Sequence, residues 1–179
     1  MNNKDYKLVA VVGKTNTGKT TFLKKYIVDK FKNNIIIDFT NSWEVFKIEE
    51  IQDFESLKAY RGGTYRLFKL VLYDELEEKA IEILKLKSNY NLIIDDADVR
   101  IFRIAKKYYK DLFFAYRHLK INVFIVCHSI QDIPTEVRRV LDYMVLFQVS
   151  DNKYKIQNKL SKYQFIIYNR DELIEKFNF

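Results

Sequence analysis

Cysteine, proline and glycine are scarce in this chain of 179 residues, which contains one, one and four of them. The single cysteine, Cys127, has no partner in the chain, so a fold stabilised by internal disulfides is excluded. Without proline-rich or glycine-rich stretches, the sequence contains no linker that would mark a domain boundary. We therefore expect one domain over residues 1–179, a length that can bury a core without structural metals.

Long apolar runs are also missing. No run approaches the roughly 20 residues that a helix needs to cross a bilayer, and no secretory signal precedes the first apolar segment. We therefore expect a cytoplasmic protein without a membrane span. Thirteen tyrosines and fourteen phenylalanines exclude a disordered composition. The net charge of +7 favours a polyanionic partner such as nucleic acid, although solubility alone also explains such a charge.

Apolar runs alternate with helical patterns along most of the chain. The runs at 91–94 and 121–127 are apolar throughout, as in parallel strands that are covered on both faces. The pattern predicts an α/β fold with a mostly parallel central sheet flanked by helices. A polar stretch at 150–161 between the last two strands predicts a hairpin. The remaining strands are expected at 7–12, 34–38, 65–72, 143–149 and 163–168, and the helices at 19–31, 74–87 and 99–119.

Residues 13–20, Gly-Lys-Thr-Asn-Thr-Gly-Lys-Thr, match the pattern of a phosphate-binding loop. In such a loop, backbone N–H groups surround the phosphates, Lys19 supplies a cation for the β and γ oxygens, and the Thr20 hydroxyl serves magnesium. An apolar strand precedes the loop and an amphipathic helix begins inside it, as the mechanism requires. The residues expected to bind ATP are Gly13, Lys14, Thr15, Asn16, Thr17, Gly18, Lys19, Thr20 and Thr21.

Two neighbouring carboxylates follow the apolar run that ends at Ile94. Asp95 stands at the carboxyl end of a predicted buried strand, where ligands of α/β proteins collect, so we expect it to orient Mg²⁺. Asp96 is expected to be the catalytic base that polarises the attacking water, with a helix-capping or structural role as the alternative. Asp98 is better explained as a cap of the helix that follows.

Polar residues also follow the run at 121–127, which should bring them to the same sheet edge as the phosphates. Gln131 or Ser129 is expected to sense the γ-phosphate. Cys127 and His128 suggest a thiol nucleophile with its base, but neighbours on a strand point to opposite faces. Cys127 is therefore interpreted as a structural residue.

Basic residues gather in two further segments. Arg138 and Arg139 have two interpretations: a finger that completes the catalytic site of a neighbouring subunit, or solvated surface arginines. One face of the helix expected at 99–119 is also basic. It can follow a DNA backbone or simply be solvated. Its residues are Arg100, Arg103, Lys107, Lys110 and Arg117.

Three segments together resemble the FtsK/HerA superfamily of P-loop ATPases, and most closely its viral genome-packaging branch. They are the loop at 13–20, Leu-Ile-Ile-Asp-Asp at 92–96 and Cys-His-Ser-Ile-Gln-Asp-Ile-Pro at 127–134. Members carry a phosphate loop, an acidic pair, a polar segment with glutamine and an arginine, in the order found here. One departure is Asp96, because the family usually has the longer glutamate there.

The resemblance implies a RecA-like core, in which one strand lies between the phosphate-loop strand and the Asp95 strand. It implies a homo-oligomeric ring in which an arginine enters the neighbour's site. It also implies an ATPase that uses ATP and Mg²⁺ to move DNA, without sequence specificity, into a viral capsid, with the portal vertex as a further partner. Such a protein would act in the host cytoplasm or in the virion.

Three alternatives stay open. A phage assembly or secretion ATPase of the zonular-occludens type has similar motifs but usually carries a membrane-spanning segment. A small nucleotide kinase uses the same loop but needs a second pocket and an arginine-rich lid, for which no segment is obvious. A nucleotide-switched scaffold would bind through nearly the same residues, so sequence separates it least well from an ATPase.

Overall fold

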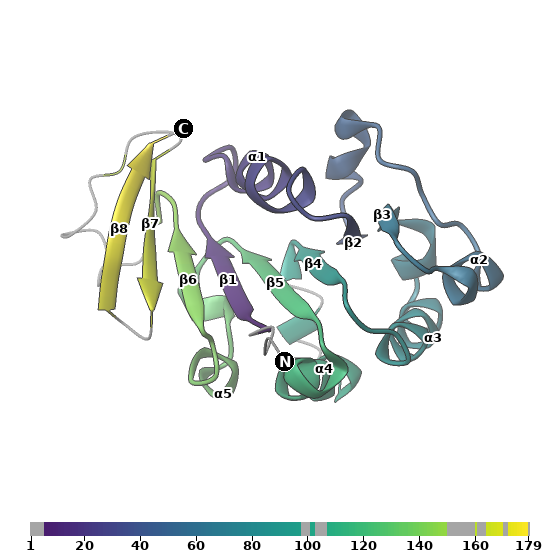
Figure 1. The fold of residues 1–179 in the computed structure, drawn as a ribbon. Coiled ribbons are helices and arrows are strands. Elements are labelled where there is room, and N and C mark those ends of the chain that lie inside the picture. The colour runs from purple at the N-terminus through teal and green to yellow at the C-terminus, as the bar shows by residue number, and fades with distance from the viewer. Residues whose placement is uncertain are drawn as a thin grey trace.

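A single eight-stranded sheet, in the order β3-β2-β4-β5-β1-β6-β7-β8, organises the chain (Figure 1). The strands from β3 to β6 in this order pair in parallel, whereas β7 and β8 are antiparallel additions at one edge. The predicted α/β fold with a mostly parallel sheet is therefore confirmed. The strands are β1 (Leu8–Val12), β2 (Asn33–Asp38), β3 (Gly63–Leu67), β4 (Asn91–Asp95), β5 (Asn122–Cys127), β6 (Tyr143–Leu146), β7 (Gln164–Asn169) and β8 (Glu172–Asn178).

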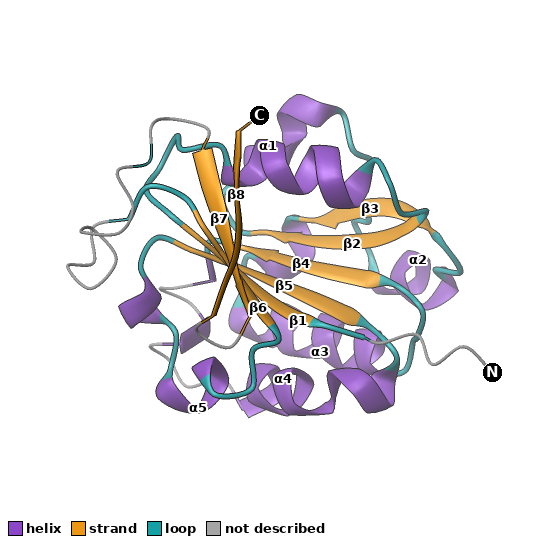
Figure 2. Ribbon diagram, turned by 60° about the vertical axis from the view of Figure 1, so that its left-hand side comes forward, coloured by secondary structure: helices purple, strands orange, loops and turns teal. Residues whose placement is uncertain are grey.

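The computed structural model describes residues 6–97, 101–102, 107–149, 160, 164–169 and, for the backbone, 172–178. Helices cover both faces of the sheet (Figure 2). One face carries α1 (Lys19–Leu23) and its π-helical continuation η1 (Lys24–Val28); the other carries α3 (Asp74–Lys85), α4 (Lys107–Leu119) and α5 (Thr135–Arg138). No helix in these residues is long and apolar enough to span a membrane. Shorter elements lie in the connections: η2 (Ser42–Phe46), α2 (Phe54–Ala59), η3 (Lys69–Val71) and η5 (Ile130–Asp132).

Strand residues alternate between two apolar cores. On β4, Ile94 belongs to the larger core, which also contains α3 and α4 residues, and Ile93 belongs to the core that contains α1 residues. The same alternation separates Ile125 from Val126 on β5. Because both faces of each central strand are buried, these strands are apolar throughout, as the sequence predicted.

The order of the central strands matches the RecA-like core that the resemblance implied. β5 pairs with β1 on one side and with β4 on the other, so it lies between the phosphate-loop strand and the Asp95 strand. Parallel strands end at the same sheet edge, so Val12, Asp95 and Cys127 are brought close together. β6 and β7 pair antiparallel, as the predicted hairpin requires, while residues 150–159 lie outside the described residues.

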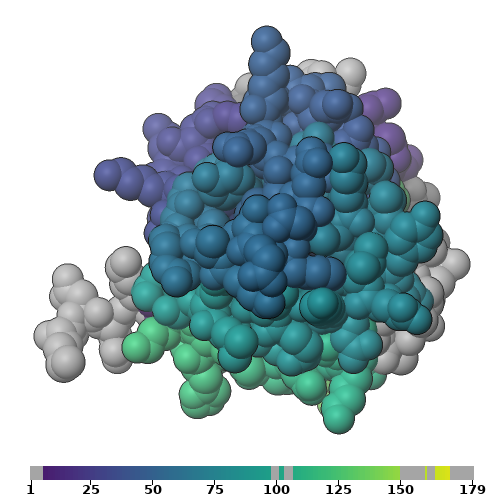
Figure 3. Space-filling view, turned by 90° about the vertical axis from the view of Figure 1, so that its right-hand side faces the viewer, coloured from purple at the N-terminus to yellow at the C-terminus, as the bar shows by residue number. Residues whose placement is uncertain are grey.

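The strand predicted at 65–72 is wrong in its second half. β3 ends at Leu67, opposite Ile37 near the end of its partner β2, and the chain then forms η3. On its other side, β3 meets the segment around Glu50, because Arg66 exchanges backbone hydrogen bonds with Glu49 and Ile51 (2.9 and 3.0 Å). Figure 3 shows the molecule from the β3 edge of the sheet, where the blue and teal segments that contain α2 and α3 form the surface.

The helix predicted at 99–119 is described from Lys107 as α4, so its expected start cannot be compared with the structure. Three residues given roles in that region, Asp98, Arg100 and Arg103, lie outside the described residues. The helix predicted at 19–31 divides into α1 and η1 and ends at Val28.

Candidate active site

Two glycines allow the loop between β1 and α1 to adopt its shape. A Cβ on Gly13 would lie 2.5 Å from the Cβ of Phe147, so any side chain here would force the loop away from Phe147, the residue after β6. Gly18 caps α1 with a φ of 104°, in the left-handed region that favours glycine. The loop is tied to the sheet because the N–H of Gly13 donates to the Cys127 carbonyl (3.1 Å). The predicted phosphate loop is therefore pre-shaped by its own backbone.

Lys19 lies inside this loop, with only 7% of its surface exposed. Its ammonium donates to the carbonyl oxygens of Gly13 (2.7 Å) and Lys14 (3.1 Å), and it lies 3.3 Å from Nδ1 of His128. Thr17 is also buried and donates its hydroxyl to the Lys14 carbonyl (2.8 Å). Thr17 therefore shapes the loop, whereas Lys19 provides its cation.

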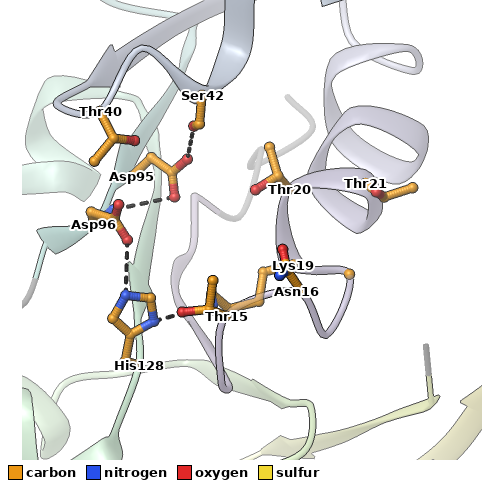
Figure 4. Close-up of a pocket in the computed structure, with 11 residues that line it drawn as sticks. Thr15, Asn16, Lys19, Thr20, Thr21, Thr40, Ser42, Asp95, Asp96 and His128 are labelled. Carbon is orange, nitrogen blue, oxygen red and sulfur yellow. Dashed lines mark hydrogen bonds and ion pairs between the residues drawn. The ribbon is translucent and has the colours of Figure 1, made fainter. Parts of the chain in front are cut away.

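A pocket of 490 Å³ opens between the loop and the carboxyl ends of β4 and β5 (Figure 4). It brings the phosphate loop together with both predicted carboxylates, Asp95 and Asp96. It also includes three residues to which the sequence assigned no role in the site, Thr40, Ser42 and His128. The full lining is Thr15, Asn16, Gly18, Lys19, Thr20, Thr21, Thr40, Ser42, Asp95, Asp96 and His128.

Asp95 is buried at the end of β4, with 4% of its surface exposed. Its Oδ2 accepts hydrogen bonds from the Ser42 hydroxyl (2.9 Å) and the Trp43 indole N–H (2.8 Å), and its Oδ1 accepts the Asp96 N–H (3.1 Å). Burial raises the pKa of Asp95 to about 6, the charge of Asp96 adds to this rise, and the Ser42 and Trp43 donors oppose it. A cation in the pocket would favour the charged form.

The oxygen atoms around the pocket suit magnesium. Thr20, Asp95 and Asp96 supply a hydroxyl and two carboxylates, and Mg²⁺ prefers oxygen ligands. In nucleotide sites Mg²⁺ is usually held by one or two carboxylates together with the phosphates and several waters. Within the described ranges, no group of three or more His, Cys, Asp or Glu side chains forms a metal cage. The donor set therefore fits a cation shared with phosphates.

His128 connects Lys19 to Asp96. An ammonium can only donate, so Nδ1 of His128 accepts from Lys19 and Nε2 carries the ring proton. Nε2 lies 3.3 Å from Oδ1 of Asp96, which it can therefore orient. Asp96 itself has a φ of 52°, a left-handed conformation that Asp and Asn tolerate better than most residues. Strand alternation could have revealed His128: Cys127 is buried in the larger core, so the next side chain points elsewhere.

Gln131 and Ser129 do not line the pocket. The Ser129 hydroxyl accepts the Gln131 N–H (3.2 Å), and Ser129 forms a capping box with Asp132 around η5. The Gln131 side chain is exposed on this short helix. Sensing of the γ-phosphate by Gln131 stays a prediction. Of the polar residues that follow β5, His128 is the one that lines the pocket.

Arg138 and Arg139 are exposed and also lie outside the pocket lining. Their helix, α5, precedes β6, and in Figure 1 it lies at the foot of the sheet, whereas the phosphate loop follows the upper end of β1. The nearby backbone contact from Asp142 to Leu8 (2.9 Å) fixes this end of β1 beside the start of β6. The arginines therefore do not serve this chain's own pocket, and a role in a neighbour's site stays a prediction.

The described part of the predicted basic face is partly paired with carboxylates. Lys107 is exposed, whereas Lys110 lies 3.5 Å from Glu136 and Arg117 lies 2.6 Å from Asp142. Asp142 is buried and also accepts the Tyr116 hydroxyl, so Arg117 helps to anchor α4 to the sheet. DNA contact through this face stays a prediction, and Arg117 has a structural role in addition.

Comparison with solved structures finds the same fold in viral and bacterial ATPases. The genome packaging NTPase B204 from Sulfolobus turreted icosahedral virus 2, in complex with AMPPCP, has a TM-score of 0.78 at 18% identity, covering 98% of both chains. Its complex with AMP gives 0.80, also at 18% identity and with 98% of both chains covered. EssC (ATPases 2 and 3) from Geobacillus thermodenitrificans gives 0.62 at 12% identity, covering 96% of this chain and 39% of that one. These likenesses confirm the fold that the sequence resemblance implied.

Comparison by sequence gives the family. No curated protein matches the chain. The profile described as Poxvirus A32 protein matches residues 1–179, the whole sequence. This chain is a member of the Poxvirus A32 protein family.

Proposed function

We propose that this protein is an ATPase that drives DNA into a viral capsid. One observation carries the proposal: a pocket lined by Lys19, Thr20, Asp95 and Asp96 lies in a fold shared with a genome packaging NTPase over 98% of both chains. Membership of the Poxvirus A32 family supports a viral role. The relatives in complex with AMPPCP and ATP-gammaS support ATP as the nucleotide.

Five side chains of the pocket have a place in hydrolysis. The loop N–H groups and Lys19 bind the phosphates. Thr20 and Asp95 would hold Mg²⁺, and this ion would neutralise the negative charge that develops on the phosphates. Asp96 accepts the proton of the attacking water, and His128 holds the Asp96 carboxylate in place from 3.3 Å. Hydrolysis in such sites depends mainly on positioning and electrostatic stabilisation, which these fixed donors and acceptors provide.

The net charge of +7 suits a polyanionic partner, and in a packaging protein that partner is DNA. We propose that it is gripped through phosphates, without sequence preference, by the basic face that includes Arg100, Arg103, Lys107 and Lys110. A motor of this kind acts as a homo-oligomeric ring, docked on the portal vertex of the capsid. Both the ring and the portal contact belong to this proposal.

DNA should accelerate ATP hydrolysis, and this is the test of the proposed function. Phosphate release is measured with and without duplex DNA of two unrelated sequences, at several salt concentrations. DNA affinity should fall with salt, with a logarithmic slope of about −0.9 for each phosphate neutralised, and should be equal for both sequences. Replacing Lys107 by alanine should reduce the slope by about one, whereas the control Lys58→Ala, on α2, should leave it unchanged.

Other outcomes of this assay favour the alternatives. A nucleotide kinase would ignore DNA and transfer phosphate to a nucleoside acceptor instead of water. A nucleotide-switched scaffold would bind ATP but release phosphate slowly or not at all. Strong sequence selectivity or salt-insensitive binding would contradict a phosphate grip.

Replacing Asp96 by asparagine should lower turnover about 100-fold, the lower end of what a general base contributes, while nucleotide affinity changes little. Asparagine keeps the shape and tolerates the φ of 52°, so the backbone is not strained, but its amide cannot take the water's proton. Turnover and nucleotide binding are measured separately, with Asp111→Asn, a half-exposed residue of α4, as the control. If nucleotide binding collapses instead and turnover per bound nucleotide is normal, Asp96 belongs to the metal site.

A further inference from the structure

The carboxylate of Asp95 is engaged unequally at its two oxygens. Oδ2 accepts two hydrogen bonds, from Ser42 (2.9 Å) and Trp43 (2.8 Å), whereas Oδ1 accepts one, from the backbone of Asp96 (3.1 Å). A carboxylate oxygen offers about two lone-pair positions. Oδ2 is therefore saturated by the protein, and Oδ1 keeps acceptor capacity toward the pocket.

Trp43 approaches Asp95 from outside the pocket. Its side chain is fully buried, lies 5.5 Å from the Phe46 ring between centroids, and does not line the cavity. An indole N–H can only donate, and when buried it needs an acceptor. Asp95 is that acceptor, so rotation of the carboxylate would break a buried hydrogen bond. Trp43 thus holds Asp95 without touching the nucleotide itself.

The segment that carries Ser42 and Trp43 is fixed by a second carboxylate. Asp38, fully buried at the end of β2, accepts the backbone N–H groups of Ser42 (2.9 Å) and Trp43 (3.0 Å). Its neighbour in sheet register is Asp95. Arg66 of β3 lies 3.7 Å from Asp38 and supports it from the far side. The adjacent strands β2 and β4 therefore both end in an aspartate that is hydrogen-bonded by Ser42 and Trp43. Asp38 accepts from their backbone N–H groups, and Asp95 accepts from their side chains.

We infer that Trp43 and Ser42 are positioning residues that orient Asp95 so that Oδ1 is the oxygen available to the magnesium nucleotide. The inference rests on the proposed function, since it concerns the same site. It assigns the η2 segment, for which the sequence suggested no role, to metal binding. Residues that hydrogen-bond a metal ligand without touching the metal typically contribute about 10-fold or more to metal affinity.

Trp43→Phe tests the inference, because it keeps an aromatic ring in the core and removes the N–H donor. Binding of Mn²⁺, used as a spectroscopic probe for Mg²⁺, is measured by electron paramagnetic resonance at saturating ADP. We expect about 10-fold weaker Mn²⁺ binding, and a matching rise in the Mg²⁺ concentration that gives half-maximal turnover. Excess Mg²⁺ should recover most of the turnover. Ser42→Ala, which removes only a hydroxyl, should act in the same direction with a smaller effect.

Phe46→Leu is the matched control, since it disturbs packing against Trp43 without removing a polar atom. Thermal unfolding checks that each variant is folded. As Trp43 is the only tryptophan of the chain, its emission should change when Mg²⁺ and ADP are added to the unmodified protein. That change should be absent in Asp95→Asn.

Two results would overturn the inference: unchanged Mn²⁺ affinity in folded Trp43→Phe and Ser42→Ala, or an equal loss in Phe46→Leu. If the protein hydrolyses ATP but shows either of these results, the proposed function stands and the inference on Trp43 and Ser42 is wrong. If Mn²⁺ binding at saturating ADP depends on Trp43 as expected but the protein never hydrolyses ATP, the inference stands and the proposed function is wrong.

Discussion

Lys19→Ala is expected to abolish ATP hydrolysis. The Lys19 ammonium is held between the carbonyl oxygens of Gly13 and Lys14, at the border of the pocket, whereas Lys14, the other lysine of the loop, does not line the pocket. Without this cation, the charge that builds up on the phosphates during transfer is not neutralised from the loop. Phosphate release by the purified variant measures the effect, and nucleotide binding is measured alongside it.

The fold of this variant needs its own measurement. Lys19 is only 7% exposed and donates two hydrogen bonds to backbone carbonyls, so its replacement also removes contacts that support the loop. Losing such bonds costs about 1–3 kcal/mol, which a domain of this size tolerates while staying folded. Lys30→Ala removes the same charge from an exposed position after η1 and serves as the control. Normal turnover in a folded Lys19→Ala protein would show that hydrolysis does not use this loop.

The central strands of the fold could be predicted because their residues are buried on both faces. Segments that are apolar almost throughout, such as Asn91–Asp95 and Asn122–Cys127, are typical of parallel strands that are covered on both faces. The end of β3 could not be predicted, because it depends on where its partner β2 ends at Asp38. The same holds for the backbone pairing of β3 with the segment around Glu50, which local sequence does not encode.

The site could be predicted wherever one short segment carries the chemistry. The phosphate loop and Asp95 follow from local sequence because each sits at a strand end. The contacts of Asp95 with Ser42 and Trp43 could not be predicted, because they join residues 53 and 52 positions apart, which the pairing of β2 with β4 brings together. His128 stands between these cases. The sequence places His128 at the end of a predicted strand, but its contact with Lys19 joins residues 109 positions apart and depends on β5 lying beside β1.

Turnover per chain should rise with protein concentration, or on DNA that nucleates a ring, if Arg138 or Arg139 completes a neighbour's site. Both arginines are exposed at the C-terminal end of α5 and lie outside the lining of this chain's own pocket, so an isolated monomer should be nearly idle. A guanidinium near the γ-phosphate stabilises the transition state, an effect worth about a thousandfold or more. The double variant Arg138→Ala, Arg139→Ala should therefore lose about a thousandfold in turnover at high concentration.

Mixing experiments separate a shared site from a general loss of activity. Lys19→Ala subunits keep their arginines, and subunits without Arg138 and Arg139 keep their phosphate loops, so mixed rings contain some complete interfaces. Neither variant alone should work, and the mixture should recover part of the activity. Arg61→Ala, which removes an exposed arginine beyond α2, is the control and should behave like the unmodified protein. Turnover per chain that stays flat from dilute to concentrated protein, with no recovery on mixing, would make both arginines surface residues. It would also remove the main mechanistic support for a ring motor.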